Sequence, residues 1–434
     1  MSLITIGILG VVALLLLLFF LRMPVGFAMG LVGFVGFWKV INLQAALGML
    51  GTEIWNVFSS YGLTVIPLFI LMGQICFYAG VNKRLYQTAF AWLGHVRGGL
   101  SMATILACAG FSAISGSNTA TAATMSTVAL PEMHKYKYNP ILSTSCVAVG
   151  ATLGVVIPPS VVLLIIGLQT SQDIAKLFWG GVIPGLLLCL FFILTVTWLC
   201  HRHPDWGPAG PKTTWKEKFA SLPGSIEMVV LFCLVMGGLF AGFFTPSEAG
   251  AAGSMLAIII SCIGRKLSWD GFKSAVFDTI RVSCMILMIV TGAVLFGRFL
   301  AVTRLPFEAA DWVAALNVPH VVIIFALCAI YVLGGMIMDA LALLLITIPI
   351  FFPLADAMGY DPLWFSVLIT VVTTMGAVTP PVGVNTFIVA SMATGVPMHK
   401  IFRGVSLFLF SYLACIGLML LFPQIVLFLP SLIQ

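Results

Sequence analysis

A short polar segment interrupts an apolar stretch in the first half of the chain and carries side chains that could bind an ion. Residues 115–121 read Ser-Gly-Ser-Asn-Thr-Ala-Thr. Hydroxyl and amide oxygens, together with carbonyls that a glycine leaves unpaired, are the neutral oxygen ligands that suit Na⁺. A helix that starts at Thr119 would also offer free N–H groups to an anion. The alternative is a helix-packing surface made of small residues, which is common in membranes.

A double proline further along the chain is the expected partner of this segment. The sequence Ile157-Pro158-Pro159-Ser160 breaks a helix and leaves carbonyl groups unpaired, because proline has no N–H to donate. Irregular backbone at membrane depth is tolerated only where protein or water satisfies it, so we expect the break to lie beside the polar segment and to complete a cation site. The candidate ligands of this first site are Ser115, Gly116, Ser117, Asn118, Gly154, Pro158 and Pro159.

The second half contains a related but less polar arrangement. Its candidate tip runs from Gly334 to Asp339, and its break is Thr379-Pro380-Pro381. Asp339 lies deep in an apolar stretch, where ion binding, gating or a structural hydrogen bond must offset the cost of a carboxylate. The candidate ligands of this second site are Gly334, Asp339, Gly376, Thr379 and Pro380.

Further polar residues near the tips and breaks are candidates for contact with a substrate. They are Thr119, Thr121, Ser160, Asn385 and Arg298. Arg298 has a competing interpretation, because it lies near the outer end of its span and could snorkel to the interface instead.

The composition of the chain indicates that these residues lie in a membrane protein. Hydrophobic residues make up 61% of the 434 positions and charged residues 8%, whereas about a quarter of a soluble domain is charged. A bilayer removes the difficulty, because the exterior can then be apolar too. The net charge of +6 comes from basic residues in loops, which favours a role in topology and argues against nucleic-acid binding.

Motifs of enzymes and of metal sites are missing from the sequence. There is no Ser/His/Asp set, HExxH or GxSxG motif, and the ten cysteines are scattered without a CxxC pair. His201 and His203 form the only close histidine pair, and no further ligand accompanies them in their polar linker. We therefore expect neither an enzyme nor a cofactor.

The prolines reveal an internal repeat at an offset of 222 residues. Pro24 aligns with Pro246, Pro131 with Pro353, Pro140 with Pro362, and Pro158-Pro159 with Pro380-Pro381. The contexts agree as well, since Gly-Val-Val-Ile-Pro-Pro at 154–159 aligns with Gly-Ala-Val-Thr-Pro-Pro at 376–381. The chain therefore consists of two homologous halves joined by a polar linker.

Charge indicates that the two repeats are inverted. The loop 131–140 carries two lysines and a histidine, whereas the equivalent loop 353–362 carries two aspartates and no basic residue. Lysine and arginine favour the cytoplasmic side, so equivalent loops are expected to face opposite compartments. Inversion requires an odd number of crossings per half, which is five if each half contains one re-entrant hairpin and one broken helix that crosses once. With both termini outside, this topology leaves 16 of the 20 Lys and Arg residues on the cytoplasmic side.

The sequence thus predicts an all-α polytopic membrane protein with two inverted-topology repeats, about ten crossings and two re-entrant helical hairpins. The first repeat, 1–200, comprises scaffold helices 1–97, a hairpin 98–130, a broken helix 141–170 and a last helix 174–200. A cytoplasmic linker follows at 201–223. The second repeat, 224–434, comprises scaffold helices 224–317, a hairpin 318–352, a broken helix 363–395 and a last helix 398–421. The mixed segments 44–60, 82–97 and 265–282 suit helices that lie at the interface.

Over essentially its whole length the chain resembles the large membrane subunit of TRAP transporters, the tripartite ATP-independent periplasmic family. The resemblance rests on the paired proline motifs and on Ser115–Met125, IAKLFWGGVIPG at 174–185 and GFFTPSEAGAAG at 242–253. It implies a bacterial inner-membrane importer with periplasmic termini, driven by Na⁺, that takes up an organic carboxylate such as a C4-dicarboxylate, sialic acid or a 2-oxo acid. It also implies a small four-helix membrane subunit, a periplasmic substrate-binding protein, and a transport domain that moves like an elevator.

The resemblance also implies roles for single residues. Ser115, Ser117 and the Pro158-Pro159 break would serve one Na⁺ site, and Asp339 with Thr379-Pro380-Pro381 would serve the other. The second tip lacks the serines of the first, so its ligand set departs from strict repetition. Two alternatives remain: a stand-alone Na⁺/carboxylate symporter of related inverted-hairpin architecture, and an ion channel, for which no filter motif is found.

Overall fold

The computed structural model describes residues 2–314, 318–393 and 395–432, and within these ranges every regular element is a helix. Seven of the described helices are long and apolar enough to cross a membrane, and further shorter helices are also apolar. This confirms the predicted all-α membrane class. Outside the described residues lie 1, 315–317, 394 and 433–434. Residues 315–317 end the predicted segment 224–317, and residue 394 belongs to the predicted broken helix 363–395.

The helices follow one another in the same order in both halves. The first half contains α1 (Leu3–Phe19), α2 (Val25–Val40), α3 (Leu43–Phe58), α4 (Val65–Tyr78), α5 (Val81–Leu93), α6 (Gly99–Ser115), α7 (Asn118–Lys135), α8 (Pro140–Ala151), α9 (Val161–Thr170) and α10 (Ile174–Arg202). The second half contains α12 (Pro223–Phe240), α13 (Pro246–Ile263), α14 (Trp269–Thr303), α15 (Leu305–Ala314), α16 (His320–Gly335), α17 (Ala340–Ala357), α18 (Pro362–Gly376), α19 (Val384–Met392), α20 (Met398–Ser406), α21 (Leu409–Leu421) and α22 (Gln424–Leu427). Short 3₁₀ turns lie at Tyr61–Thr64, Thr152–Val155, Pro204–Trp206 and Pro430–Leu432.

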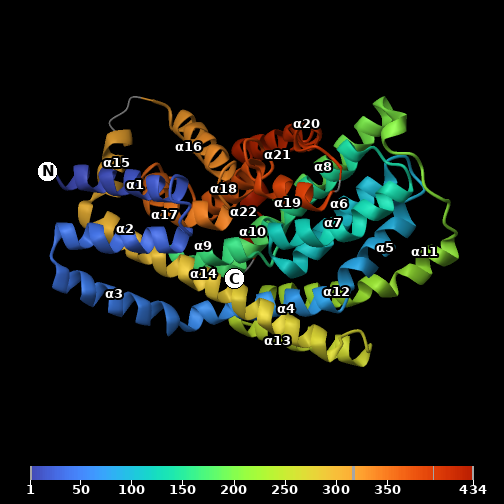
Figure 1. Cartoon of the computed structure of the whole chain (residues 1–434), viewed down its shortest axis with the longest axis horizontal. Helices are drawn as coiled ribbons and strands as arrows, with labels where there is room; N and C mark the ends of the chain where they lie inside the picture. The colour runs from blue at the N-terminus through green and yellow to red at the C-terminus, as the bar shows by residue number, and fades with distance from the viewer. Residues whose placement is uncertain (1, 315–317, 394, 433–434) are drawn as a thin grey trace.

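Equivalent helices have equivalent neighbours. Helix α2 packs against α14, as α13 packs against α4. In the same way α6 contacts α8 and α16 contacts α18, while α7 contacts α19 and α17 contacts α9. Figure 1 shows α3, α4, α12 and α13 along the lower edge of the elongated molecule, with the hairpins and broken helices above them. We call α1–α5 and α12–α15 the scaffold helices, and α6–α9 with α16–α19 the hairpin bundle.

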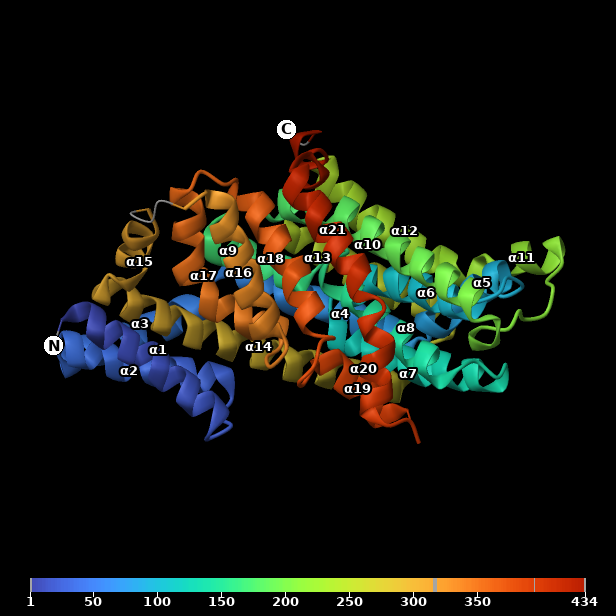
Figure 2. The ribbon, with the colours of Figure 1, turned by 90° about the horizontal axis from the view of Figure 1, so that it is seen from above.

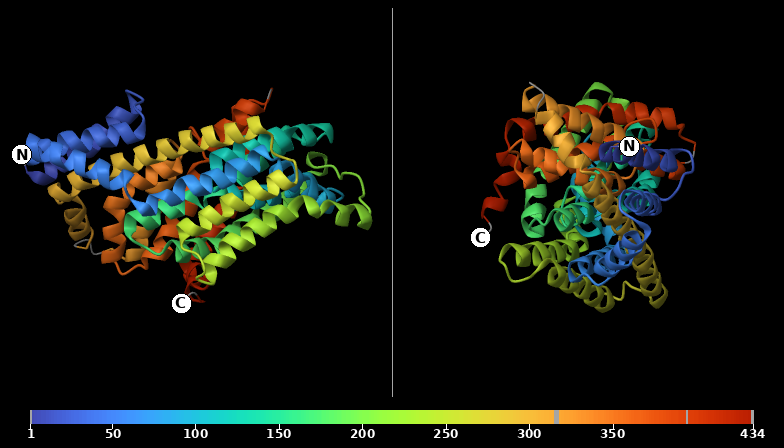
Figure 3. Two further views of the ribbon diagram at one scale, coloured as in Figure 1. Left: turned by 90° about the horizontal axis from the view of Figure 1, so that it is seen from below. Right: turned by 90° about the vertical axis from the view of Figure 1, so that its left-hand side faces the viewer.

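Glycines let the scaffold helices approach each other closely. A Cβ atom added at Gly33 of α2 would lie 2.6 Å from the backbone of Leu295 on α14, and one at Gly26 would lie 2.7 Å from the carbonyl oxygen of Met288. Backbones at this distance pack by van der Waals contact without intervening side chains, which is a common way of joining helices in a membrane. Figure 3 shows the long α14 (yellow) running beside the N-terminal helices (blue).

One predicted interfacial helix is wrong. Residues 269–303 form the single 35-residue helix α14, so 265–282 is not a separate element. In the first half the equivalent stretch is divided into α3 and α4 by Ser59-Ser60-Tyr61-Gly62, which contains a glycine and two serines. Arg281-Val282-Ser283-Cys284 stands at the corresponding place in α14 and contains no glycine or proline, so the helix continues.

Several predicted boundaries also need correction. The first hairpin extends beyond 130, because α7 continues through Pro131 to Lys135, and α17 likewise continues through Pro353 to Ala357. The inter-proline loops are therefore only a few residues long. The last helix of the second half is divided between α20 and α21. The linker 201–223 is not wholly irregular, since it contains the short helix α11 (Trp215–Ser221).

The linker fixes the start of the first hairpin. The Gly98 N–H donates to the carbonyl of Gly207 at 2.8 Å, and the Asn139 N–H donates to Trp206 at 3.0 Å. The Leu100 N–H donates to the Tyr138 hydroxyl at 3.2 Å. Burial raises the pKa of Tyr138 to about 12.

Candidate functional site

The first tip and the first break meet backbone to backbone. Gly116 ends α6 with a φ of +59°, and a Cβ there would lie 2.7 Å from the carbonyl oxygen of Pro159. A Cβ on Gly154 would lie 2.6 Å from the carbonyl oxygen of Ser117. The Val161 N–H donates to Gly116 at 3.4 Å. The structure therefore brings the predicted residues of the first site together, and only glycine fits at the two crossing points.

The hydroxyls of the first tip form a directed chain. Thr121 donates its hydroxyl hydrogen to the Ser117 carbonyl at 2.7 Å. In the 3.0 Å contact between Ser115 Oγ and Thr121 Oγ1 the donor must then be Ser115. Ser115 keeps its lone pairs free for another partner, which is the property a cation ligand needs. Ser117 caps α7 by accepting from the Ala120 N–H at 3.4 Å.

The second tip and break are joined in the same way by different residues. A Cβ on Gly376 would lie 2.5 Å from the carbonyl oxygen of Val332, and one on Gly335 would lie 2.7 Å from that of Thr373. The carbonyl of Met336 accepts from the N–H groups of Val382 at 3.3 Å and Gly383 at 3.0 Å. The closely packed glycine of this tip is Gly335 rather than the predicted Gly334, whose added Cβ would meet only the side chain of Leu343.

Two buried amides have polar atoms without a hydrogen-bond partner among the described residues. Asn385, near the start of α19, is fully buried, and neither its Oδ1 nor its Nδ2 has a partner in the described part of the chain. Asn118, the first residue of α7, accepts from the Thr119 N–H at 2.9 Å, but its Nδ2 has no partner among the residues described. A buried polar atom without a partner destabilises a fold by about 1–3 kcal/mol. Both side chains therefore fit a role toward a bound ligand or ion better than a role in packing.

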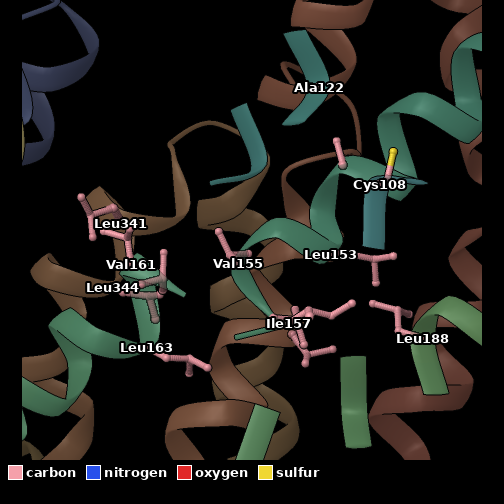
Figure 4. Packing of buried hydrophobic residues seen from close by; sticks show 14 of the residues in the cluster. Cys108, Ala122, Leu153, Val155, Ile157, Val161, Leu163, Leu188, Leu341 and Leu344 are labelled. Carbon is pink, nitrogen blue, oxygen red and sulfur yellow. The ribbon is translucent and has the colours of Figure 1, made fainter. Parts of the chain in front are cut away.

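The two halves interlock at their tips. In the close view of Figure 4, Leu341 and Leu344 of α17 lie near Val161 and Leu163 of α9. The second hairpin thus packs on the broken helix of the first half, and α19 packs on the first hairpin in return. Figure 2 shows α9 (green) among the orange helices of the second half, and α9 contacts α17 and α18.

A cavity of about 970 Å³ lies between the hairpin bundle and the scaffold. Its lining includes both tips, with Ser115 to Ala120 from the first and Ile337 to Asp339 from the second. The opposite wall is formed by α4, α14 and the turn between α1 and α2. Most of the lining is apolar, with aromatic side chains such as Phe77 and Phe111. A mostly apolar cavity with a few convergent polar groups is typical of a small-molecule site.

Three charged residues line this cavity. Asp339 is fixed at the second tip, where its carboxylate caps α17 by accepting from the Leu341 N–H at 3.1 Å. Asp278 of α14 accepts a hydrogen bond from the Tyr78 hydroxyl at 2.7 Å. Arg22, in the turn after α1, is exposed at the cavity and forms no ion pair within the described residues.

Several predicted substrate contacts do not reach the cavity. Arg298 is not among the lining residues and pairs with Glu53 of α3, with 2.8 Å between Nε and Oε1, so its substrate role stays a prediction. Ser160 donates to the Val155 carbonyl at 2.6 Å and caps α9. The Thr121 hydroxyl donates to the Ser117 carbonyl within the first tip. Thr119 does line the cavity, whereas Asn385 lies buried behind it. Of the second candidate ion site only Asp339 reaches the lining, and Thr379 donates to the Met375 carbonyl at 2.6 Å.

Sequence reasoning missed Arg22, Asp278 and Gln74, which also line the cavity. Each belongs to a scaffold element, and only tertiary packing brings it opposite the tips. The sequence contained one signal: Arg22 is the first charged residue after an apolar N-terminal segment.

Comparison with known proteins identifies the family to which this chain belongs. The family "Tripartite ATP-independent periplasmic transporter, DctM component" matches residues 12–425 of the chain. The chain belongs to this family. It is a TRAP transporter large permease subunit, and the predicted resemblance is confirmed.

Two relatives and one solved structure illustrate the similarity. The chain is 32% identical to the C4-dicarboxylate TRAP transporter large permease protein DctM of Pseudomonas aeruginosa, over 88% of this chain and 89% of the relative. It is 29% identical to the sialic acid TRAP transporter large permease protein SiaM of Vibrio cholerae, over 96% of each chain. The crystal structure of the Alcanivorax borkumensis YdaH transporter matches with a TM-score of 0.59 at 15% identity, over 88% of this chain and 90% of that one, which shows a similar fold.

Proposed function

We propose that this TRAP subunit carries an organic carboxylate across the bacterial inner membrane by Na⁺-coupled symport. The observation that carries the proposal is the cavity lined by both tips, where the first tip carries the Ser115 hydroxyl with lone pairs available to a cation. Substrate and coupling ion would then be bound at adjacent places, as coupling requires. The relatives transport C4-dicarboxylates and sialic acid by name, so a carboxylate is the expected class of substrate.

Two Na⁺ sites are proposed, one at each tip. The first uses the Ser115 and Ser117 oxygens, Asn118 and carbonyls of the opposed break around Gly154 and Pro158-Pro159. The second has Asp339 as its charged group, with backbone carbonyls of the Gly376–Pro380 break. Neutral oxygens and one carboxylate bind a small cation while still allowing its release.

The substrate carboxylate is proposed to bind at the first tip. The N-terminus of the 18-residue helix α7 faces the cavity through Asn118, Thr119 and Ala120. This end of a helix favours an anion through its partial positive charge, although the Thr119 and Ala120 N–H groups already donate to Asn118 and Ser117. At the second tip the Asp339 carboxylate already occupies the equivalent position at α17. The two tips would therefore differ in role.

The proposed transport cycle moves the hairpin bundle against the scaffold as an elevator. The matching neighbours of equivalent helices support two repeats, and the opposite charge of the loops 131–140 and 353–362 supports their inversion. The close glycine contacts between α2 and α14 suit a scaffold that stays rigid. A small membrane subunit and a periplasmic binding protein are the proposed partners, and both termini are proposed to be periplasmic.

Reconstitution tests the function. The chain, together with its small subunit in liposomes, should take up a carboxylate only with an inward Na⁺ gradient and only after the cognate binding protein is added. Rapid uptake of free substrate without that protein would favour the stand-alone symporter. Uptake that is indifferent to Na⁺ would contradict symport.

Cysteine labelling tests the inverted topology. Lys135 and Asp356 are exposed and lie near the equivalent loop ends of the two halves. Single cysteines at these positions should react with an impermeant reagent from opposite sides of the membrane. The exposed native Cys233, Cys262 and Cys284 must first be replaced. Labelling of both positions from one side would contradict inversion.

A further inference from the structure

The scaffold wall of the cavity carries a carboxylate whose role the proposed function does not explain. Asp278 lines the cavity from α14, opposite the tips. Its Oδ2 accepts from the Tyr78 hydroxyl at 2.7 Å, and Oδ1 has no hydrogen-bond partner within the described residues. Tyr78 itself is not part of the lining, so it holds the carboxylate in place from behind. The result is a positioned anion with one oxygen available to a ligand.

A carboxylate in this place conflicts with a purely anionic cargo. Two of the three charged groups that line the cavity are acidic, Asp278 and Asp339, and Arg22 is the one basic group among the described lining residues. With a Na⁺ ion at each of the two proposed sites, the charges of Arg22, Asp278, Asp339 and the two ions sum to +1. A dicarboxylate would overcompensate this charge and would place its second carboxylate against Asp278, which repels it, whereas a zwitterion adds no net charge.

The surroundings of Asp278 suit a positively charged group. Phe77 lines the cavity one residue before Tyr78, and its ring packs edge-on against the Tyr78 ring with 5.1 Å between centroids. A carboxylate with an aromatic ring nearby favours an ammonium group.

We propose that the cavity takes a zwitterionic substrate, with its carboxylate at the N-terminus of α7 and its cationic nitrogen at Asp278. This assignment rests on the proposed carboxylate transport and narrows its substrate class to carboxylates that also carry an ammonium or similar cation. Asp278 selects through charge, and Tyr78 is a positioning residue that acts through it.

The test uses matched pairs of small acids that differ in charge at one end. The purified chain with its small subunit, in Na⁺, is titrated with 4-aminobutyrate and succinate, and with 5-aminopentanoate and glutarate, and thermal stability reports binding. The wild type should bind each amino acid at least about ten-fold more tightly than the dicarboxylate of the same length, as expected for exchanging attraction for repulsion at one partly buried charge.

Variants of opposite charge sharpen the test. Asp278→Asn should abolish the preference for the amino acids, and Tyr78→Phe should reduce it by about three-fold, because one hydrogen bond to a carboxylate is lost. Arg22→Gln should increase the preference, because it removes the group that attracts a second carboxylate.

Failure of the zwitterion assignment and failure of the proposed Na⁺ symport give different results. A wild-type preference for dicarboxylates, an unchanged ratio in Asp278→Asn, or no binding of either amino acid overturns the zwitterion assignment. A shift in Na⁺ dependence in Asp278→Asn without a change in the ratio makes Asp278 an ion ligand and also overturns it. Failure of Na⁺ alone to stabilise the wild type would count against the proposed symport instead. Tyr78→Phe keeps the charge and gives a second variant if Asp278→Asn does not fold.

Discussion

The two tip-and-break pairs share an architecture but differ in chemistry. The first tip carries side-chain hydroxyls and an amide, and the end of α7 carries no charge of its own. At the second tip a single carboxylate, Asp339, caps α17. Both use a glycine crossing to bring the backbone of the tip onto the break. The geometry is therefore common to the halves, while the polar side chains differ.

This difference assigns separate tasks to the two halves. An uncharged helix end can attract the carboxylate of a substrate, whereas a helix end capped by its own carboxylate repels an anion and favours a cation. We infer that the first tip handles both Na⁺ and substrate, while the second handles Na⁺ alone. The predictions below test this division.

The largest effect is expected where the two pairs are alike. Gly154→Ala places a Cβ 2.6 Å from the Ser117 carbonyl oxygen, and Gly376→Ala places one 2.5 Å from that of Val332. Overpacking of this kind costs about 3 kcal/mol, so Na⁺-dependent uptake should fall by about a hundred-fold for either variant. Gly237→Ala in α12 is the matched control, because nothing lies within 4 Å of its added Cβ. Equal activity of all three variants would contradict the claim that only glycine fits where each tip crosses its break.

Asp339 tests the charged side of the comparison. Asp339→Asn retains a side chain that can cap α17, so the fold should persist. The loss of the charge should raise the Na⁺ concentration for half-maximal uptake by about thirty-fold, because contacts to a charged group contribute about 2 kcal/mol. Asp339→Ala removes cap and charge together and should also lower thermal stability. If Asp339→Asn keeps the wild-type Na⁺ dependence, the Asp339 carboxylate caps α17 and does not bind Na⁺.

Asn385 distinguishes ligand binding from packing in the second half. Its amide is fully buried and has no partner in the part of the chain that the structure describes, so Asn385→Leu removes a polar group that destabilises the fold. Thermal stability without Na⁺ should stay constant or rise, while uptake should fall by about ten-fold as one ligand contact is lost. Unchanged uptake would mean that the amide has no role in transport.

The sequence anticipated much of the site because its strongest signals are local. Clustered prolines and glycines favour helix breaks, so the breaks, the tips and the 222-residue repeat could be predicted, and the first tip does meet the first break, although single prolines such as Pro131 and Pro353 lie inside continuous helices. The continuity of α14 could also have been inferred from the absence of glycine and proline at 281–284.

The scaffold side of the cavity could not be predicted in this way. Asp278, Tyr78 and Arg22 come from three separate segments, and no period or motif links them. The partner of Arg298 was hidden for the same reason, because Glu53 lies 245 residues away on another helix. The pairing of Gly335 rather than Gly334 depends on which face of α16 meets α18, which the run of two glycines leaves open.

The most direct test of the account is the Na⁺ dependence of uptake after the serines of the first tip are changed. Ser115→Ala and Ser117→Ala each remove one neutral oxygen without adding charge or bulk. Each should raise the Na⁺ concentration for half-maximal uptake by about ten-fold, since a lost ligand costs about 1–3 kcal/mol. Thr127→Ala, on the exposed side of α7, should leave it unchanged. If both serine variants fold, assemble and keep the wild-type Na⁺ dependence, the first tip is a packing surface and the proposed ion site is contradicted.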